Sequence, residues 1–134
     1  HSGGARQAAQ ESLLGYPAAY SGTAVVRKYR VRILEEAEQD LFEIYRYVAI
    51  NDSSTRAECV LDRLEGLCLR LAEFPRRGHI PPELERIGVA TYREVYFKPY
   101  RVIYQIDGQD VHVHCVLDGR RSMQSLLERR LLLK

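Results

Sequence analysis

The chain has 134 residues, of which 46% are hydrophobic and 28% are charged, and its formal net charge is +2. This length allows one modest hydrophobic core, and the composition excludes a chain that is disordered throughout. No stretch approaches the roughly 20 apolar residues of a membrane-spanning helix, and residues 1–24 lack a secretory signal pattern. We therefore expect one cytoplasmic domain that makes no membrane contact.

Positive charge is concentrated in the second half of the chain. From Val25 to Phe74 there are 8 Lys and Arg against 10 Asp and Glu, whereas from Pro75 to Lys134 there are 11 against 7. This asymmetry favours an acidic partner, either a protein surface or nucleic acid. The three cysteines have no paired spacing, which predicts reduced thiols.

Residues 1–24 are rich in Gly, Ala and Ser and show no periodicity. They predict a flexible leader, in part a segment added for expression, and the alternative is a short helix over Gln7–Leu14. Residues 25–134 then form the folded domain. It opens with a strand at Arg27–Leu34, where apolar and charged side chains alternate.

Two amphipathic helices follow this strand. Apolar residues recur at three- and four-residue spacings from Leu34 to Val48, and again from Ala57 to Phe74. The polar turn Asn51–Ser54 separates the two helices, and Pro75 ends the second. This pattern predicts an antiparallel helical hairpin with a purely structural role.

The remainder predicts three strands and a short helix. After a loop over Arg76–Ile87, strands are expected at Thr91–Tyr96, Tyr100–Ile106 and Asp110–Leu117, and a final helix at Ser122–Leu133. The order β-α-α-β-β-β-α predicts an α+β fold, with a curved, mostly antiparallel sheet and a helical hairpin on one face.

Strand alternation predicts which side chains share a face of the sheet. In the last strand an apolar set should pack against the helices, namely Val111, Val113, Cys115 and Leu117. The opposite, uncovered face should then show Arg101, Gln105, His112 and His114, with Arg120 and Arg121 at its edge. Such a cationic face suits a carboxylate or phosphate, because a guanidinium donates two parallel hydrogen bonds. The alternative for Arg101 is a surface arginine that pairs with Glu94 or packs its stem on Tyr104.

Motifs of common enzymes are absent from the sequence. It contains no phosphate-binding loop, serine-centred elbow or His-Glu-x-x-His motif. His112 and His114 have a spacing that can chelate zinc, but no further ligands stand at a recognisable spacing, so no metal and no cofactor are expected. An imidazole acting as general acid or base remains an alternative.

An ordered set of segments resembles the RelE/ParE superfamily, the toxins of bacterial toxin–antitoxin and plasmid stabilisation systems. The segments are Tyr29-Arg-Val-Arg-Ile, Ala37-Glu-Gln-Asp-Leu-Phe-Glu-Ile, Leu71-Ala-Glu-Phe-Pro-Arg-Arg-Gly, Tyr92-Arg-Glu, Pro99-Tyr-Arg-Val-Ile-Tyr-Gln-Ile and Val116-Leu-Asp-Gly-Arg-Arg. They span Tyr29–Leu131, roughly three-quarters of the chain. The fold of this superfamily agrees with the predicted element order.

The resemblance implies one of two activities. RelE-like members are ribosome-dependent ribonucleases that use sheet arginines and a proton-transferring side chain, whereas ParE-like members inhibit DNA gyrase. Arg101 and Arg121 stand where the ribonuclease branch keeps catalytic arginines, but Leu127 replaces its tyrosine. Tyr92 and Glu94 likewise stand where that branch tends to carry lysines. These departures favour the ParE-like branch, although Asp118 stands where that branch often has histidine.

Three hypotheses follow from the resemblance. The first is a gyrase inhibitor that a cognate antitoxin silences, as a homodimer or a toxin–antitoxin hetero-oligomer. The second is a ribonuclease acting on ribosome-bound messenger RNA, with catalytic residues Arg101, Arg121, His112 and His114. The third is a non-toxic binding module. The residues expected to contact the target or antitoxin are Arg93, Tyr100, Arg101, Gln105, Arg120 and Arg121.

Overall fold

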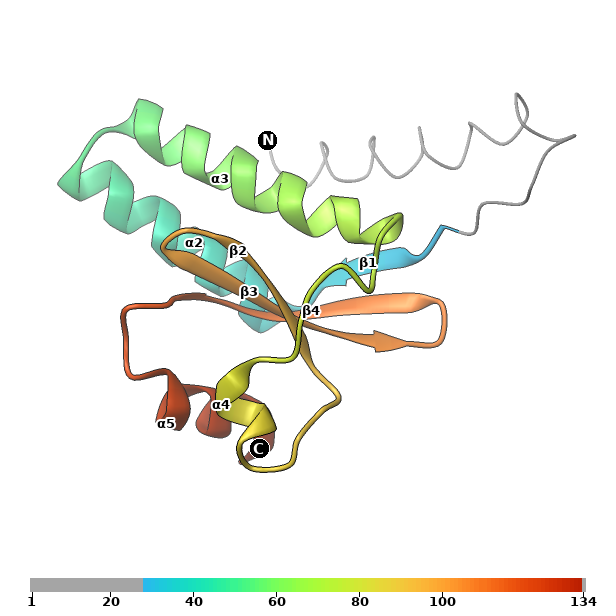
Figure 1. Ribbon diagram of the computed structural model, residues 1–134. Helices are drawn as coiled ribbons and strands as arrows, with labels where there is room; N and C mark the ends of the chain where they lie inside the picture. The colour runs from blue at the N-terminus through green and yellow to red at the C-terminus, as the bar shows by residue number, and fades with distance from the viewer. Residues whose placement is uncertain (1–27, 134) are drawn as a thin grey trace, which may run out of the picture.

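The computed structural model describes residues 28–133, and Figure 1 shows their arrangement. The predicted leader and the alternative helix Gln7–Leu14 lie outside the described residues. The elements are β1 (Arg30–Ile33), α2 (Glu35–Asn51), α3 (Ser54–Leu69), the 3-10 turn η2 (Arg70–Ala72), α4 (Pro82–Glu85), β2 (Arg93–Phe97), β3 (Tyr100–Asp107), β4 (Asp110–Asp118), α5 (Met123–Leu127) and the π-helical turn η3 (Glu128–Leu132).

The four strands form one mixed sheet in the order β1-β4-β3-β2. β1 runs parallel to β4, while β2, β3 and β4 are joined as antiparallel hairpins. The β3–β4 turn uses Gly108 at φ 63°, a left-handed conformation that glycine adopts without steric cost. The predicted α+β fold with a mostly antiparallel sheet is confirmed.

The helical hairpin of α2 and α3 covers one face of this sheet (Figure 1). Ser53 caps α3, because its hydroxyl accepts a hydrogen bond from the Arg56 backbone N–H at 3.0 Å. Both helices direct their apolar stripes at the sheet, and the resulting core contains Leu41, Leu64, Leu71, Val102, Tyr104, Val111 and Val113. Burial of these side chains supplies the main stabilising free energy of the domain.

A β-bulge at His114 changes which β4 residues face the helices. Tyr104 pairs with Val113 and Ile103 with Cys115, so His114 is the extra residue on β4. Beyond the bulge, Val116 packs toward α2 and α3, whereas Cys115 and Leu117 belong to a second core on the other face. The prediction that Cys115 and Leu117 face the helical hairpin is therefore wrong.

The second face of the sheet is covered rather than open. α4 and α5 pack on it, and the second core contains Leu84, Tyr92, Ile103, Cys115, Leu117, Met123, Leu126 and Leu127. The C-terminal turn is fixed to α2, because Arg130 Nη2 donates to Asp40 Oδ2 at 2.9 Å. The predicted C-terminal helix thus docks on the sheet, and the expectation of an uncovered second face is wrong.

No helix among residues 28–133 is both long enough and apolar enough to cross a lipid bilayer.

Candidate functional site

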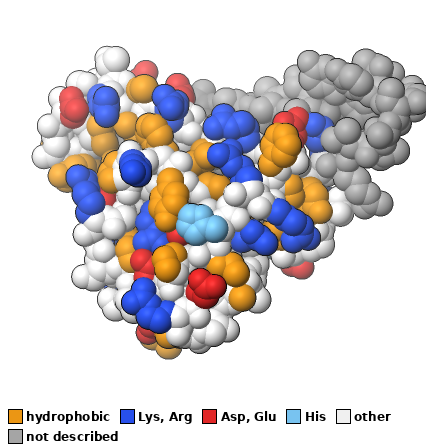
Figure 2. Space-filling view, in the orientation of Figure 1, with side chains coloured by type: hydrophobic (Ala, Val, Ile, Leu, Met, Phe, Trp, Pro, Cys, Tyr) orange, Lys and Arg blue, Asp and Glu red, His pale blue; other side chains and the backbone are white. Residues whose placement is uncertain are grey.

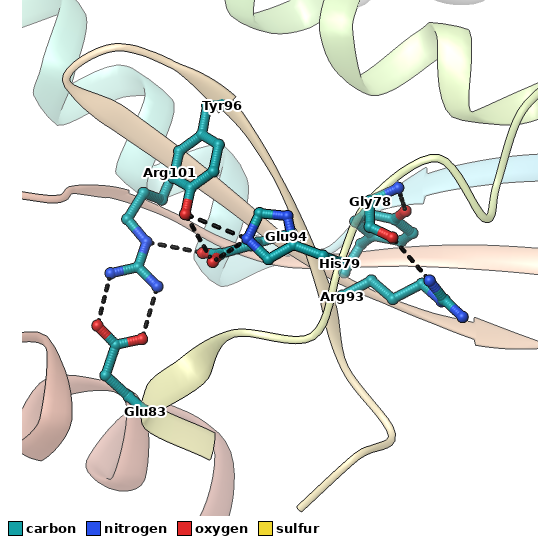
Figure 3. Close-up of polar contacts among 8 residues, drawn as sticks. Gly78, His79, Glu83, Arg93, Glu94, Tyr96 and Arg101 are labelled. Atoms are coloured by element: carbon teal, nitrogen blue, oxygen red, sulfur yellow. Dashed lines mark hydrogen bonds and ion pairs between the residues drawn. The ribbon is translucent and has the colours of Figure 1, made fainter. Parts of the chain in front are cut away.

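Arg101 lies at the centre of an ion-pair network on the α4 side of the sheet (Figure 3). Its Nη1 and Nη2 atoms donate to the two carboxylate oxygens of Glu83 at 2.8 and 2.7 Å. Its Nε atom donates to Glu94 Oε1 at 2.7 Å. The planar guanidinium is thereby held on two sides, by a bidentate contact from α4 and by a neighbouring strand.

Glu94 connects this arginine to two further side chains. Its second oxygen, Oε2, accepts a hydrogen bond from the Tyr96 hydroxyl at 2.9 Å and lies 3.0 Å from His79 Nε2. The Glu94 side chain is 0% exposed, whereas that of His79 is 56% exposed. A carboxylate this deeply buried depends on its partners, since an unpaired buried charge is strongly unfavourable.

The ionisation of the network follows from these contacts. Hydrogen bonds from Arg101 lower the pKa of Glu83, and the contact with Glu83 is the main reason that the pKa of Arg101 is raised. Burial, followed by the hydrogen bond to Glu94, raises the pKa of Tyr96. Arg101 therefore remains cationic, and its guanidinium is held between two carboxyl groups.

This geometry corrects the prediction for Arg101. The residue is 8% exposed and points into the region between the sheet and α4, not toward an open surface. Its observed state includes the alternative weighed from the sequence, the ion pair with Glu94. Sequence reasoning missed Glu83 as the second partner, because no local pattern places a four-residue helix over β3.

Arg93 and Tyr104 fix the segment that leads into α4. Arg93 Nη1 donates to the Gly78 carbonyl at 2.7 Å, while the Gly78 N–H donates to the Tyr104 hydroxyl at 3.0 Å. A Cβ atom at Gly78 would lie 2.4 Å from the Glu94 carbonyl oxygen, so only glycine fits there. Arg93, predicted as a binding residue, thus has a structural partner within the chain.

Gly119, the glycine of the Gly-Arg-Arg segment, lies directly against Arg101. A Cβ atom at this position would be 2.9 Å from Arg101 Cδ and 3.0 Å from the Pro99 carbonyl oxygen. The absence of a side chain therefore lets the turn after β4 approach the arginine stem. The next residue, Arg120, is exposed and pairs with Asp118 at 2.7 Å.

Arg121 lies at a different place from Arg101. It lines a cavity of about 220 Å³ beside α2, together with Asp40, Glu43, Ile44, Tyr47, Tyr100, Val116, Leu117 and Asp118. Its side chain is exposed and makes no ion pair with any residue in the described range 28–133. The predicted convergence of Arg101 and Arg121 on one open face is wrong, whereas Tyr100 and Arg121 do line a common cavity.

The remaining predicted side chains gather at the other end of β3. Gln105 pairs with His112 across the sheet, and its side-chain oxygen lies 3.2 Å from His114 Nε2. The His114 ring also packs edge-on against Tyr92, with centroids 5.3 Å apart. All three polar side chains are half-buried, and no cluster of three potential metal ligands occurs among residues 28–133.

Comparisons with known proteins define the class of this fold. The chromosomal ParDE toxin–antitoxin system from P. aeruginosa superposes with a TM-score of 0.57 at 14% identity, over 67% of this chain and 95% of that one. A chain of the RelBE2 toxin–antitoxin complex from Mycobacterium tuberculosis gives a TM-score of 0.49 at 22% identity, over 66% and 95%. The first of these shows that the fold is that of toxins from such systems.

Sequence comparison is more specific. Residues 31–123 match the family described as the ParE toxin of the type II toxin–antitoxin system parDE. Toxin ParE3 of Caulobacter vibrioides is 34% identical over 91 residues, which cover 68% of this chain and 87% of that protein. The chain therefore belongs to the ParE toxin family, and the predicted resemblance is confirmed.

Proposed function

We propose that this protein is a toxin that inhibits DNA gyrase through protein–protein contact and is kept inactive by an antitoxin. Membership of the ParE family supports the first part, because the resemblance to ParE-like chains implies gyrase as the target. The state of Arg101 is the observation that carries the choice of gyrase over messenger RNA. If Arg101 is not free to contact a phosphate, the sheet lacks one of the two arginines that a ribonuclease of this superfamily is expected to use.

A nuclease arginine must be free to stabilise the negative charge that develops on phosphorus. Arg101 is instead enclosed by Glu83 and Glu94, and its side chain is 9% exposed. A phosphate that approached this guanidinium would meet two carboxylates that already neutralise it. The structure thus disfavours the ribonuclease alternative at one of its two expected catalytic arginines.

The cavity beside α2 fits a contact with another protein. It combines the guanidinium of Arg121 with two tyrosines, Tyr47 and Tyr100. Three apolar and three acidic side chains complete the lining, namely Ile44, Val116, Leu117, Asp40, Glu43 and Asp118. Arginine and tyrosine are enriched among the residues that dominate the free energy of protein–protein binding. We assign the target contact to this cavity and expect Arg121 to take part in it, because its guanidinium forms no ion pair among residues 28–133.

A supercoiling assay with purified gyrase tests the proposed target. Micromolar toxin should block the conversion of relaxed to supercoiled plasmid, and pre-incubation with the antitoxin should restore it. Unchanged supercoiling at that concentration would reject gyrase inhibition. Primer extension on ribosome-bound message serves as the matched test of the alternative, since new 5′ ends would establish a ribonuclease.

The antitoxin part of the proposal is tested in cells. Induced expression should arrest growth, and co-expression of a small protein encoded beside the toxin gene should relieve that arrest. We expect acidic and apolar residues in its toxin-binding segment, because the second half of this chain carries the excess of positive charge. Normal growth of induced cells would instead favour a non-toxic binding module.

A further inference from the structure

Three arginines form a regular stripe along α3 and its C-cap residue, the first residue of η2. Arg56, Arg63 and Arg70 are spaced by seven residues, and all three are exposed. Seven residues correspond to about two helical turns and a rise of about 10.5 Å, so the three side chains project from one side of the helix over about 21 Å. We call these residues the α3 arginine stripe.

Further cations extend the stripe toward the sheet. The Arg63 guanidinium lies over the Phe97 ring, 4.9 Å from its centroid, which directs the stripe to the β2–β3 hairpin. Lys98 is exposed in the turn of that hairpin, and Arg76 and Arg77 are exposed after η2. Figure 2 shows Lys and Arg side chains gathered over α3 and over the strands beside it.

These cations lack acidic partners in the part of the chain that the structure describes. None of the six forms an ion pair with another of the residues 28–133. The two exposed acidic residues of the same helix, Glu58 and Asp62, are rotated from Arg63 by about 140° and about 100° around the helix axis. Glu65 faces inward and is 6% exposed. The positive charge of this surface is therefore available to an external anion.

We propose that the α3 arginine stripe, with Lys98, Arg76 and Arg77, binds the phosphate backbone of duplex DNA without regard to sequence. A stretch of about 21 Å corresponds to about six phosphates of one strand. The ridge between the arginines carries Cys59 and Gly66, which offer no apolar pocket for a partner protein's anchor residue. A repeated array of cations matches a repeated array of phosphates better than it matches a folded protein surface.

This inference does not rest on gyrase as the target. DNA binding is measured without gyrase, so failure of one proposal leaves the other standing. If both hold, the stripe retains the toxin on the duplex on which gyrase acts and raises its local concentration there.

Fluorescence anisotropy with the full chain and a labelled mixed-sequence duplex of about 20 base pairs tests the proposal. Affinity should fall steeply with salt, with a slope of log K against log salt of about −4 for four to five phosphate contacts. The triple variant R56Q/R63Q/R70Q should bind at least about tenfold more weakly, and its slope should be smaller by about 2.7. The double variant R56Q/R70Q, which keeps Arg63 on Phe97, provides the same test should the triple variant not fold.

The matched control removes the same charge from other surfaces. Arg46, Arg86 and Arg129 are exposed and lie on α2, at the end of α4 and on η3. The variant R46Q/R86Q/R129Q should keep the affinity within about threefold, since long-range charge effects are screened at physiological salt. An equal loss in both triple variants would overturn the assignment to α3.

Three other outcomes would also overturn it. Absence of binding at low salt would show that the stripe is only solvated. Tighter binding of polyglutamate than of duplex would identify an acidic protein as the partner. A strong preference for single-stranded DNA would point to base stacking on exposed aromatic residues such as Phe74, which is 62% exposed.

Discussion

Arg101 and Arg121 look equivalent in the sequence, yet the fold gives them opposite environments. Arg101 is buried on the α4 side of the sheet and bound by two carboxylates. Arg121 is exposed beside α2 and has no acidic partner among residues 28–133. The comparison shows that two arginines at the same end of the β3–β4 pair can differ in burial, since Arg101 is enclosed on the α4 side of the sheet and Arg121 remains exposed beside α2.

Gly119 helps to explain why Arg101 is buried while Arg121, two residues after the glycine, is exposed. Because it has no side chain, the chain after β4 packs against the Arg101 stem and then turns outward. The Gly119 N–H donates to the Pro99 carbonyl at 2.8 Å, and the Arg121 N–H donates to the Asp118 carbonyl at 3.1 Å. These two bonds shape the turn that exposes Arg120 and Arg121.

Replacement of Arg101 should have the largest effect on stability. Arg101→Met keeps much of the side-chain volume but leaves the fully buried Glu94 carboxylate without its main partner. Loss of one member of a buried ion pair costs about 3–5 kcal/mol in the free energy of unfolding. Urea denaturation followed by circular dichroism measures this loss.

The double variant Arg101→Met/Glu94→Gln provides the control. It removes the unpaired charge as well, so it should be more stable than Arg101→Met alone. A cost below about 0.5 kcal/mol for Arg101→Met would show that the pair is solvated and would return Arg101 to the list of recognition residues.

Gly119→Ala should have the next largest effect. The new methyl group would lie 2.9 Å from Arg101 Cδ and must displace the arginine stem or the turn. Overpacking of this kind costs about 1–3 kcal/mol. Urea denaturation followed by circular dichroism measures this cost. Gly88→Ala cannot serve as its control, because Gly88 has a φ of 80° and alanine would be strained there for a different reason.

The combination Gly119→Ala/Arg101→Met separates the two contacts of the new methyl group, with the Arg101 stem and with the Pro99 carbonyl. If the methyl group acts through Arg101, the added cost of Gly119→Ala should shrink in the Arg101→Met background, because methionine is more flexible. Full additivity would place the strain at the Pro99 carbonyl instead.

Glu83 should make a smaller contribution that depends on pH. Its pKa in the folded protein is lowered from 4.5, chiefly by the hydrogen bonds from Arg101. A lowered pKa means that the stabilisation is fully present above about pH 4.5 and is lost as pH falls through the folded-state pKa. At pH 7, Glu83→Gln should cost about 1 kcal/mol, since the amide retains one acceptor for the guanidinium.

The stability difference between wild type and Glu83→Gln should therefore shrink as pH falls below about 4.5. Thermal denaturation of both proteins at a series of pH values from 7 to 3 measures that difference. A difference that stays constant over this range would assign the effect to packing of α4 rather than to the charge of Glu83.

Sequence reasoning predicted the order of the elements but not the second face of the sheet. The apolar periodicities of 35–51 and 54–69 are long and regular, so both helices were found, and Asp107-Gly108 correctly marked a hairpin turn. The bulge at His114 gives no local signal, since His114 continues an alternating pattern that the backbone breaks. It moved Cys115 and Leu117 to the opposite face.

The site was harder to predict for a related reason. Burial of Arg101 requires α4, a helix of four residues whose sequence Pro-Glu-Leu-Glu resembles a loop. Only its tertiary position shows that Glu83 neutralises Arg101. Arg121 was identified correctly as an exposed cation, but its neighbours Tyr47 and Glu43 come from α2, which the sequence presented as a scaffold.

Arg121→Ala should have the smallest effect on stability and the largest on target binding. The residue is exposed and unpaired within 28–133, so truncation should change the free energy of unfolding by less than about 0.5 kcal/mol. Inhibition of gyrase should nevertheless weaken by at least about tenfold, because arginine contacts at the centre of an interface are worth about 2 kcal/mol or more.

Supercoiling titrations of Arg121→Ala, compared with the neighbouring variant Arg120→Ala, measure this effect. Arg120 carries the same charge and does not itself line the cavity, although its ion-pair partner Asp118 does, so its loss should weaken inhibition less than the loss of Arg121. Equal weakening by both variants would indicate that general electrostatic attraction, and not a specific contact in the cavity, binds the target. Both Arg120 and Arg121 would then contribute to that attraction. Full inhibition by Arg121→Ala would show that the cavity beside α2 does not contact the target. Arg101 and Arg121 would then differ only in their burial.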